Sequence, residues 1–249
     1  FSPLRIFAKW AFEKFDFSAY DLVISSSNAY FAKAARVKPG HHFCYSHTPP
    51  RVLYGYSAKS NWQANPLTKA LGNFLNHFVR QMDFVAAQNP DQMIANSRET
   101  QLRIKKFYKR SSVVINPPIA IYDEAARLFT TLNKKALTDL KTKKQNSYYL
   151  YVNRLAKSKH PDLAVQLANE LGLPLKVVGT GAMLASLQAM VKSNVEFLGG
   201  VDDEQLVDLY KNARALLYPA EDEDFGMVPV EAMAYGTPVI AHASGGPQE

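Results

Sequence analysis

The sequence of 249 residues predicts an α/β protein with doubly wound parallel sheets in two domains. In residues 148–249, short apolar runs alternate regularly with amphipathic stretches, and residues 1–118 show the same elements at less even spacing. The lysine-rich segment 119–147 separates them. Apolar strands joined by helices pair in parallel, because each helix returns the chain to the same end of the sheet. We therefore expect a domain over 1–118, a connector over 119–147, and a second domain over 148–249, with a cleft between the two domains.

The elements of the first domain follow from apolar spacing and turn residues. Leu4, Phe7, Ala11 and Phe15 recur at helical spacing, and Pro66 is typical of a helix start. The elements expected in order are a helix over 4–15, strands over 21–25 and 42–46, a helix over 66–87, a strand over 93–95, a basic helix after Ser97, and a strand over 112–115. Within the connector, three leucines predict one short surface helix.

The second domain has a cleaner alternation. The strands expected are 148–152, 175–179, 195–198, 215–218 and 238–241, and the helices expected are 160–171, 181–192, 203–213 and 227–235. In doubly wound sheets, ligands bind at the carboxyl ends of strands, where helix N-termini point their amide groups outward. We therefore expect functional residues directly after strands.

Composition and charge exclude several classes of protein. Cys44 is the single cysteine and cannot form an internal disulfide, and no apolar stretch reaches the roughly 18 residues of a membrane-spanning helix. The net charge of +7 is concentrated in basic clusters at 105–110 and 134–144, which suit an anionic membrane surface or phosphorylated substrates. We expect no nucleic-acid partner, because no nucleic-acid-binding motif accompanies the charge. The chain begins with Phe1 and ends in mid-pattern, so we expect an internal fragment of a longer protein.

The segment 223–238 is the most informative candidate site. It follows the predicted strand 215–218 and contains Gly226, which permits close backbone approach, and Pro229, which suits the first turn of a helix. The N-terminal amides of that helix form an anion site. Glu223 and Glu231 bracket this helix start, and carboxylates accept hydrogen bonds from the vicinal hydroxyls of sugars and ribose. We expect both carboxylates to line one pocket, although Glu223 by itself is also compatible with a plain helix-terminal charge.

A second candidate site follows the predicted strand 148–152. Arg154 and Lys159 leave the end of this strand ahead of a helix that starts near Pro161. Two cations in such a position fit a diphosphate group. Lys157 lies between them and is better explained as a solvated side chain.

In combination, these segments resemble retaining GT-B-fold glycosyltransferases of family 4. Glu223 and Glu231 enclose seven residues, as in the E-x7-E motif of that family, and Arg154 with Lys159 is similar to its phosphate loop, with Asn153 where glycine is usual. Three further matches are Asn96-Ser97 with Asn116-Pro117-Pro118 at the end of the first domain, the closing Gly245-Gly246-Pro247-Gln248-Glu249 turn, and His47-Thr48-Pro49-Pro50-Arg51, which resembles an element of a bacterial mannosyltransferase-like branch.

The resemblance implies a GT-B-like fold, with two Rossmann-like domains that are both truncated here, and a nucleotide-sugar donor held mainly by the second domain. The resemblance assigns the leaving diphosphate to Arg154 and Lys159 and the nucleotide ribose to Glu231. It assigns the sugar hydroxyls to Glu223 with the amides of Phe225, Gly226 and Met227, the phosphate to amides near Val228, and the nucleobase to Gly199-Gly200-Val201. In the first domain, it assigns the donor or acceptor sugar to His47 and an acceptor phosphate to Arg51. It implies no metal and no cofactor other than the nucleotide-sugar substrate.

The function expected from this resemblance is that of a retaining hexosyltransferase in the synthesis of a bacterial surface polysaccharide or lipid-linked glycan. GDP-mannose is the first donor to test. We expect a cytoplasmic location, with peripheral contact to the inner face of the cell membrane. The alternatives are a non-catalytic nucleotide-sugar or glycan-binding module and a soluble-product synthase of the same fold. A dinucleotide oxidoreductase is disfavoured, because Leu184 replaces the third glycine of its fingerprint.

Overall fold

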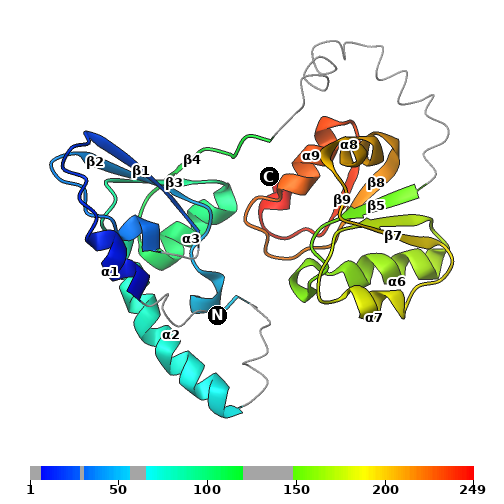
Figure 1. Ribbon diagram of the computed structural model, residues 1–249, viewed down its shortest axis with the longest axis horizontal. Coiled ribbons are helices and arrows are strands. Elements are labelled where there is room, and N and C mark those ends of the chain that lie inside the picture. The colour runs from blue at the N-terminus through cyan, green and yellow to red at the C-terminus, as the bar shows by residue number, and fades with distance from the viewer. Residues whose placement is uncertain (1–6, 29–30, 57–65, 120–147) are drawn as a thin grey trace, which may run out of the picture. The chain divides into compact units, whose positions relative to one another are not determined.

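The computed structural model describes residues 7–28, 31–56, 66–119 and 148–249, with the side chains of 66–71 left out. They form two compact units, Phe1–Pro117 with Glu249 and Pro118–Gln248, and each is described by itself (Figure 1). Residues 120–147 of the predicted connector, with its predicted short helix, lie outside the described residues. Residues 4–6 of the first predicted helix lie outside them as well.

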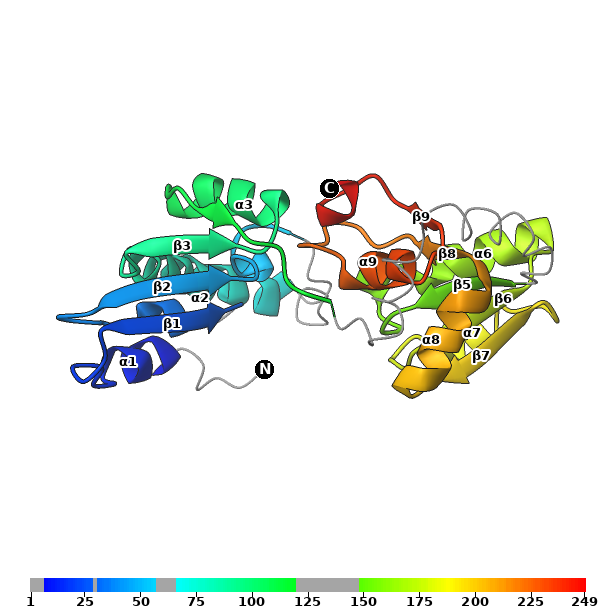
Figure 2. The ribbon, with the colours of Figure 1, turned by 90° about the horizontal axis from the view of Figure 1, so that it is seen from above.

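Unit 1 contains a four-stranded parallel sheet with the order β1-β2-β3-β4. Its strands are β1 (Leu22–Ser27), β2 (His41–Ser46), β3 (Gln92–Ala95) and β4 (Val113–Val114). The helices are α1 (Ala8–Glu13), α2 (Pro66–Ala86) and α3 (Arg98–Tyr108), with short 3-10 helices η2 (Phe31–Ala34) and η3 (Arg51–Leu53). Figure 2 shows β1, β2 and β3 running in the same direction, so their carboxyl ends meet at one edge of the sheet.

The core of unit 1 packs the sheet against α3, with Cys44, Met93 and Ile104 fully buried. A buried ion pair links η2 to α2. Lys33 Nζ lies 2.6 Å from Asp83 Oδ1, and both side chains are 1% exposed. The Tyr54 hydroxyl donates a hydrogen bond to Asp83 Oδ2 over 3.0 Å. These contacts give the buried charges the partners that they require.

Unit 2 is a five-stranded parallel sheet with the order β7-β6-β5-β8-β9. Its strands are β5 (Tyr148–Val152), β6 (Leu175–Val178), β7 (Val195–Gly199), β8 (Ala213–Tyr218) and β9 (Val239–Ala241). The helices are α6 (Pro161–Leu171), α7 (Leu184–Gln188), α8 (Asp203–Asn212) and α9 (Met227–Ala234), with 3-10 helices η5 (Lys157–Lys159) and η6 (Gly246–Gln248). The chain starts in the centre at β5, builds outward through β6 and β7, and then crosses to β8 and β9. The predicted doubly wound α/β fold is thus confirmed.

Helices cover both faces of this second sheet (Figure 1). One core cluster joins β5, β6 and β8 to α8 and α9 through residues such as Tyr210 and Ala232. The other joins the strands to α6 and α7 through residues such as Val165 and Leu187. The switch in chain direction falls between β5 and β8, and ligands bind doubly wound sheets at this kind of position.

One predicted helix is wrong in length. The sequence pattern predicted a helix over 181–192, but α7 covers only Leu184–Gln188. The preceding residues bond to the loop after β5 instead of extending the helix. Leu155 N donates to Thr180 O over 2.9 Å, and Met183 N donates to Leu155 O over 3.0 Å. This tertiary contact overrides the local helical pattern.

Candidate functional site

The loops that follow β5 and β8 meet at the switch point of unit 2. Lys159 in η5 and Glu223 after β8 lie 64 residues apart in sequence and form an ion pair through Nζ and Oε1. Their side chains are only 15% and 11% exposed. Two residues predicted separately, one for phosphate and one for sugar, are therefore direct partners. A partly buried pair of this kind is screened less by solvent than a surface pair is.

A buried residue of the central strand β5 holds the backbone of Lys159 in position. The Tyr151 hydroxyl donates to the backbone oxygen of Lys159 over 3.1 Å, and Tyr151 is 1% exposed. Burial raises the pKa of Tyr151, so its hydroxyl stays a proton donor across the physiological range. Arg154 and Lys157 are exposed in the same loop. The loop thus holds one cation in place and presents two to solvent.

The loop after β5 rests on a glycine-containing turn after β6. A Cβ atom on Gly179 would overlap the carbonyl oxygen of Asn153, and one on Gly181 would lie 2.7 Å from the carbonyl carbon of Leu155. Asn153 replaces the glycine expected from the resemblance, and its Oδ1 accepts a hydrogen bond from the Arg154 amide over 2.9 Å. The close backbone approach therefore comes from the neighbouring turn rather than from the loop itself.

The loop that carries Glu223 is held by the turn Gly245-Gly246. Gly246 N donates to Glu223 O over 2.9 Å, and Asp222 N donates to Ser244 Oγ over 3.1 Å. Side chains on either glycine would meet the backbone of residues 223–225. The Gly-Gly turn thus fixes the backbone position of Glu223 by hydrogen bonding and close packing.

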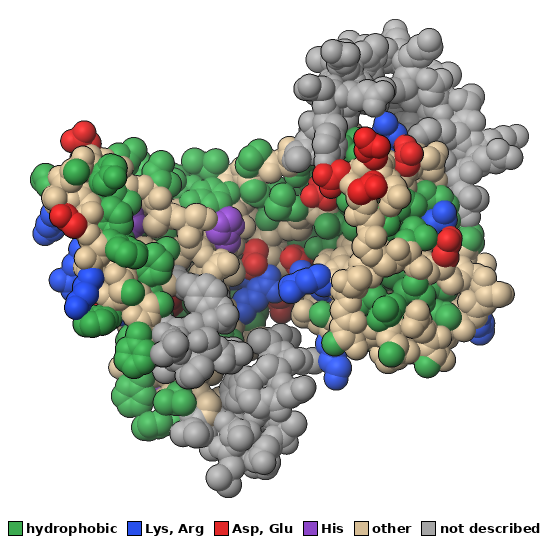
Figure 3. Space-filling model, in the orientation of Figure 1, with side chains coloured by type: hydrophobic (Ala, Val, Ile, Leu, Met, Phe, Trp, Pro, Cys, Tyr) green, Lys and Arg blue, Asp and Glu red, His purple; other side chains and the backbone are tan. Residues whose placement is uncertain are grey.

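Helix α9 begins directly after this loop with no side chain capping its first turn. Gly226 is its N-cap, and Pro229 has no amide hydrogen, so Met227 and Val228 supply the unsatisfied N–H groups of that turn. No acidic residue lies in the first turn of α9. By contrast, α8 begins with acidic side chains, which gather over that helix in Figure 3. The start of α9 therefore favours an anion, and the start of α8 does not.

Glu231 lies one turn further along α9 and has a different partner. The Tyr210 hydroxyl donates to Glu231 Oε2 over 3.2 Å, and Glu231 is half-buried. The sequence pattern predicts that Glu223 and Glu231 line one pocket. In the structure, Glu223 pairs with Lys159 across the switch point, whereas Glu231 pairs with α8.

The predicted nucleobase segment is divided by the structure. Gly199 accepts a hydrogen bond from Gly179 N over 2.7 Å, and the space around Gly199 and Gly200 is open. Val201 instead packs against the hydrophobic core beside α8. Its side chain therefore has a packing role, and Gly199-Gly200 is the part of this segment that leaves room for a ligand.

In unit 1, His47 follows β2 and is bonded to a residue that the sequence analysis missed. Ser26 Oγ lies 2.9 Å from His47 Nε2, and the Thr100 hydroxyl donates to His47 O over 3.1 Å. The ring of Tyr45 meets the His47 ring edge-on at 5.2 Å. Arg51 begins η3, where its backbone oxygen accepts the Tyr54 amide over 3.1 Å. The parallel pairing of β1 with β2 is the signal that would have placed Ser26 beside His47.

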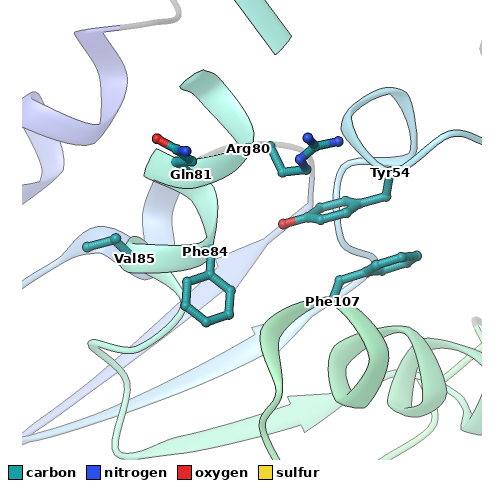
Figure 4. Close-up of a pocket in the computed structure, with 6 residues that line it drawn as sticks. All are labelled: Tyr54, Arg80, Gln81, Phe84, Val85 and Phe107. Atoms are coloured by element: carbon teal, nitrogen blue, oxygen red, sulfur yellow. The ribbon is translucent and has the colours of Figure 1, made fainter. Parts of the chain in front are cut away.

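Unit 1 also has a shallow groove of about 480 Å³ (Figure 4). Tyr54 and Phe107 stack at 4.3 Å between ring centroids on one side of it. Its remaining lining residues are Arg80, Gln81, Phe84 and Val85 of α2. None of the predicted site residues lines this groove.

Among the described residues, no helix combines the length and the apolar character needed to span a bilayer.

The second half of the chain is similar to a known protein family. Residues 134–249 match the family model described as glycosyl transferases group 1. Human alpha-1,3/1,6-mannosyltransferase is 30% identical over 182 residues, which are 64% of this chain and 44% of the relative. The GDP-mannose-dependent alpha-mannosyltransferase of Mycolicibacterium smegmatis is 36% identical over 99 residues, which are 40% of this chain and 26% of the relative. The chain thus spans less than half the length of these relatives.

The fold is also found in solved structures. Sucrose-phosphate synthase from Thermosynechococcus elongatus superposes with a TM-score of 0.65 at 22% identity, over 98% of this chain and 60% of that protein. An identity this low carries information about the fold alone. The comparisons thus show that residues 134–249 are similar to glycosyl transferases group 1, and that the chain has the parallel α/β architecture of GT-B glycosyltransferases.

Proposed function

We propose that this chain is part of a retaining hexosyltransferase that moves a sugar from a nucleotide-sugar donor to a glycan or lipid-linked acceptor. The observation that carries the proposal is the Lys159–Glu223 ion pair, which lies at the switch point of unit 2 with the uncapped α9 start next in sequence. A cation, a carboxylate and free amide groups are the groups that a diphosphate and a sugar require.

The donor diphosphate is the group that best fits this arrangement. Lys159 is held in place by its ion pair and by the Tyr151 contact, and Arg154 is exposed in the same loop. The amides of Met227 and Val228 add two donors without adding a mobile charge. Fixed donors stabilise a developing charge more effectively than mobile ones, because they need little reorganisation during the reaction.

The proposed chemistry follows the family that the sequence resembles. The bond from the anomeric carbon to the donor phosphate oxygen breaks, and a bond to the acceptor oxygen forms on the same face. The acceptor proton passes to the leaving diphosphate. Glu223 orients the sugar hydroxyls with the Phe225 and Gly226 amides, and its ion pair with Lys159 suits a positioning group better than a nucleophile.

Mannose is the proposed sugar and GDP the proposed nucleotide. Two of the compared relatives are named as mannosyltransferases, one of them GDP-mannose-dependent. Glu231 is proposed for the ribose and Gly199-Gly200 for the base. His47 and Arg51 are proposed for the reacting sugar and an acceptor phosphate. We also propose a cytoplasmic enzyme of surface-glycan synthesis with peripheral membrane contact.

Thermal unfolding with GDP, UDP and ADP and their sugar conjugates tests the proposal. A ligand at a hundred times its Kd adds about 2.7 kcal/mol to stability, which raises the midpoint visibly. Lys159→Ala should abolish the shift caused by the preferred nucleotide. Lys157→Ala is the matched control, because it removes an exposed lysine from the same 3-10 helix.

Two results would contradict the proposal. If no nucleotide raises the midpoint of a chain that unfolds cooperatively, the donor site is wrong. If the two lysine variants retain the same shift, Lys159 does not bind the diphosphate. Nucleotide binding without sugar transfer would instead favour the non-catalytic binding module.

A further inference from the structure

Tyr210 has a hydroxyl group whose position packing alone does not explain. It lies in the last turn of α8, is 1% exposed, and belongs to the core cluster that contains Leu150 and Ala232. The core needs its ring, and a phenylalanine would fill nearly the same volume. The hydroxyl instead reaches Glu231 Oε2, 3.2 Å away on the neighbouring helix α9.

The ring of Tyr210 is held from several directions. It stacks on Tyr235 with a centroid distance of 6.0 Å and an angle of 10° between the ring planes. The Tyr210 backbone oxygen accepts a hydrogen bond from the buried Thr237 hydroxyl, just before β9. The hydroxyl thus occupies a position that α8, the end of α9 and the entry to β9 determine together. The Glu231 side chain has more rotatable bonds than the tyrosine, so it can adapt to this position.

The protonation state of Tyr210 suits a permanent hydrogen-bond donor. Burial, with a smaller contribution from the Glu231 carboxylate, raises the pKa of Tyr210 above its ordinary value. The hydroxyl therefore keeps its proton at all physiological pH values. It uses one acceptor position on Oε2 and leaves Oε1 of the half-buried carboxylate for a ligand.

We infer that Tyr210 is a positioning residue that holds the Glu231 carboxylate in the rotamer that accepts the vicinal hydroxyls of the donor ribose. The inference rests on the proposed function, in which Glu231 binds the ribose. A carboxylate already fixed before binding loses little further side-chain freedom when the diol arrives, so the diol binds more tightly. Tyr210 itself touches no substrate.

The test measures ribose-dependent affinity by calorimetry. GDP and UDP are each compared with their 2′,3′-dideoxy analogues on the full chain. Tyr210→Phe should weaken binding of the preferred ribonucleotide about five- to tenfold, the usual effect of one lost hydrogen bond, and leave the dideoxy analogue unchanged. Tyr235→Phe is the matched control, because it removes a buried hydroxyl with no hydrogen-bond partner from the ring stacked on Tyr210.

Two further variants keep the test decisive. Glu231→Asp shortens the side chain by one methylene and draws the carboxylate away from the Tyr210 hydroxyl, so it should lose the same ribose-dependent affinity in an intact core. Glu231→Gln measures the role of the carboxylate itself. Thermal unfolding without ligand shows whether each variant is folded.

Different outcomes refute different steps. If Tyr210→Phe weakens both nucleotides equally, or neither, Tyr210 is a core residue only and the inference is wrong. The same holds if Glu231→Asp keeps the full preference for the ribonucleotide. If wild type does not distinguish the ribonucleotide from its analogue, or Glu231→Gln leaves that preference intact, the proposed ribose site is wrong and the inference falls with it.

Discussion

A methyl group at Gly245 is expected to displace the loop that carries Glu223. Gly245 has φ +66°, and a Cβ atom there would overlap the Glu223 carbonyl oxygen and lie 2.9 Å from the Glu223 nitrogen. Ordinary contacts to carbon need about 3.5 Å, so the backbone of residues 222–224 must move by roughly 1 Å. A shift of about 1 Å in a positioning group costs on the order of a hundredfold in rate. Gly245→Ala should therefore reduce sugar transfer by about that factor and weaken nucleotide binding.

Gly172→Ala separates this displacement from backbone strain. Gly172 follows α6 with φ +63°, and no atom lies within 4 Å of the position of its missing Cβ. Both variants carry the roughly 1–2 kcal/mol penalty of a left-handed alanine, which urea unfolding measures. Only Gly245→Ala carries the collision as well. The reasoning is refuted if both variants lose the same stability and bind nucleotide equally well by calorimetry.

Three further predictions concern unit 1. Ser26→Ala should lower the rate of sugar transfer from a labelled donor about fivefold, because His47 loses a ring hydrogen bond, whereas Ser25→Ala should leave the rate unchanged. Lys33→Met should cost about 3–5 kcal/mol in urea unfolding, because the Asp83 carboxylate stays buried without its partner; a second change, Asp83→Leu, should restore most of the loss. Burial lowers the pKa of His42 in the folded chain, so the unfolded chain binds the proton more tightly. The contribution of His42 to the free energy of unfolding should therefore be constant above about pH 6.5 and decrease below it. His42→Gln should remove this pH-dependent contribution from a pH series of urea midpoints.

The fold class was predictable because apolar runs and turn residues act locally. The strands at 148–152 and 175–178 were found within one residue by their hydrophobic pattern. The length of α7 was not predictable, because the backbone of Leu155, which lies in another loop, forms hydrogen bonds with the backbone of Thr180 and Met183. Contacts of this kind depend on which loops meet, and the sequence pattern within a single segment does not contain that information.

The candidate site was predicted as separate residues rather than as contacts. Lys159 and Glu223 were chosen for different ligands, and their ion pair depends on β5 and β8 being neighbours in the sheet. Ser26 was not predicted, because its place beside His47 depends on the register of β1 against β2, which is a contact between distant segments. Tyr210 looked like any apolar position of an amphipathic helix, because no sequence pattern shows where a buried hydroxyl points.

The glycines after β6 bear on how donor preference can be changed by design. Gly179 and Gly181 accommodate the backbone of Asn153 and Leu155, so the two loops form one interlocked shape. Transplanting only the loop after β5 from a relative would place a foreign backbone against an unmatched surface. Chimeras that carry residues 153–160 and 179–183 together should fold, whereas those that carry one segment alone should lose the fit. The two segments therefore behave as a single structural unit, although 18 residues separate them in the sequence.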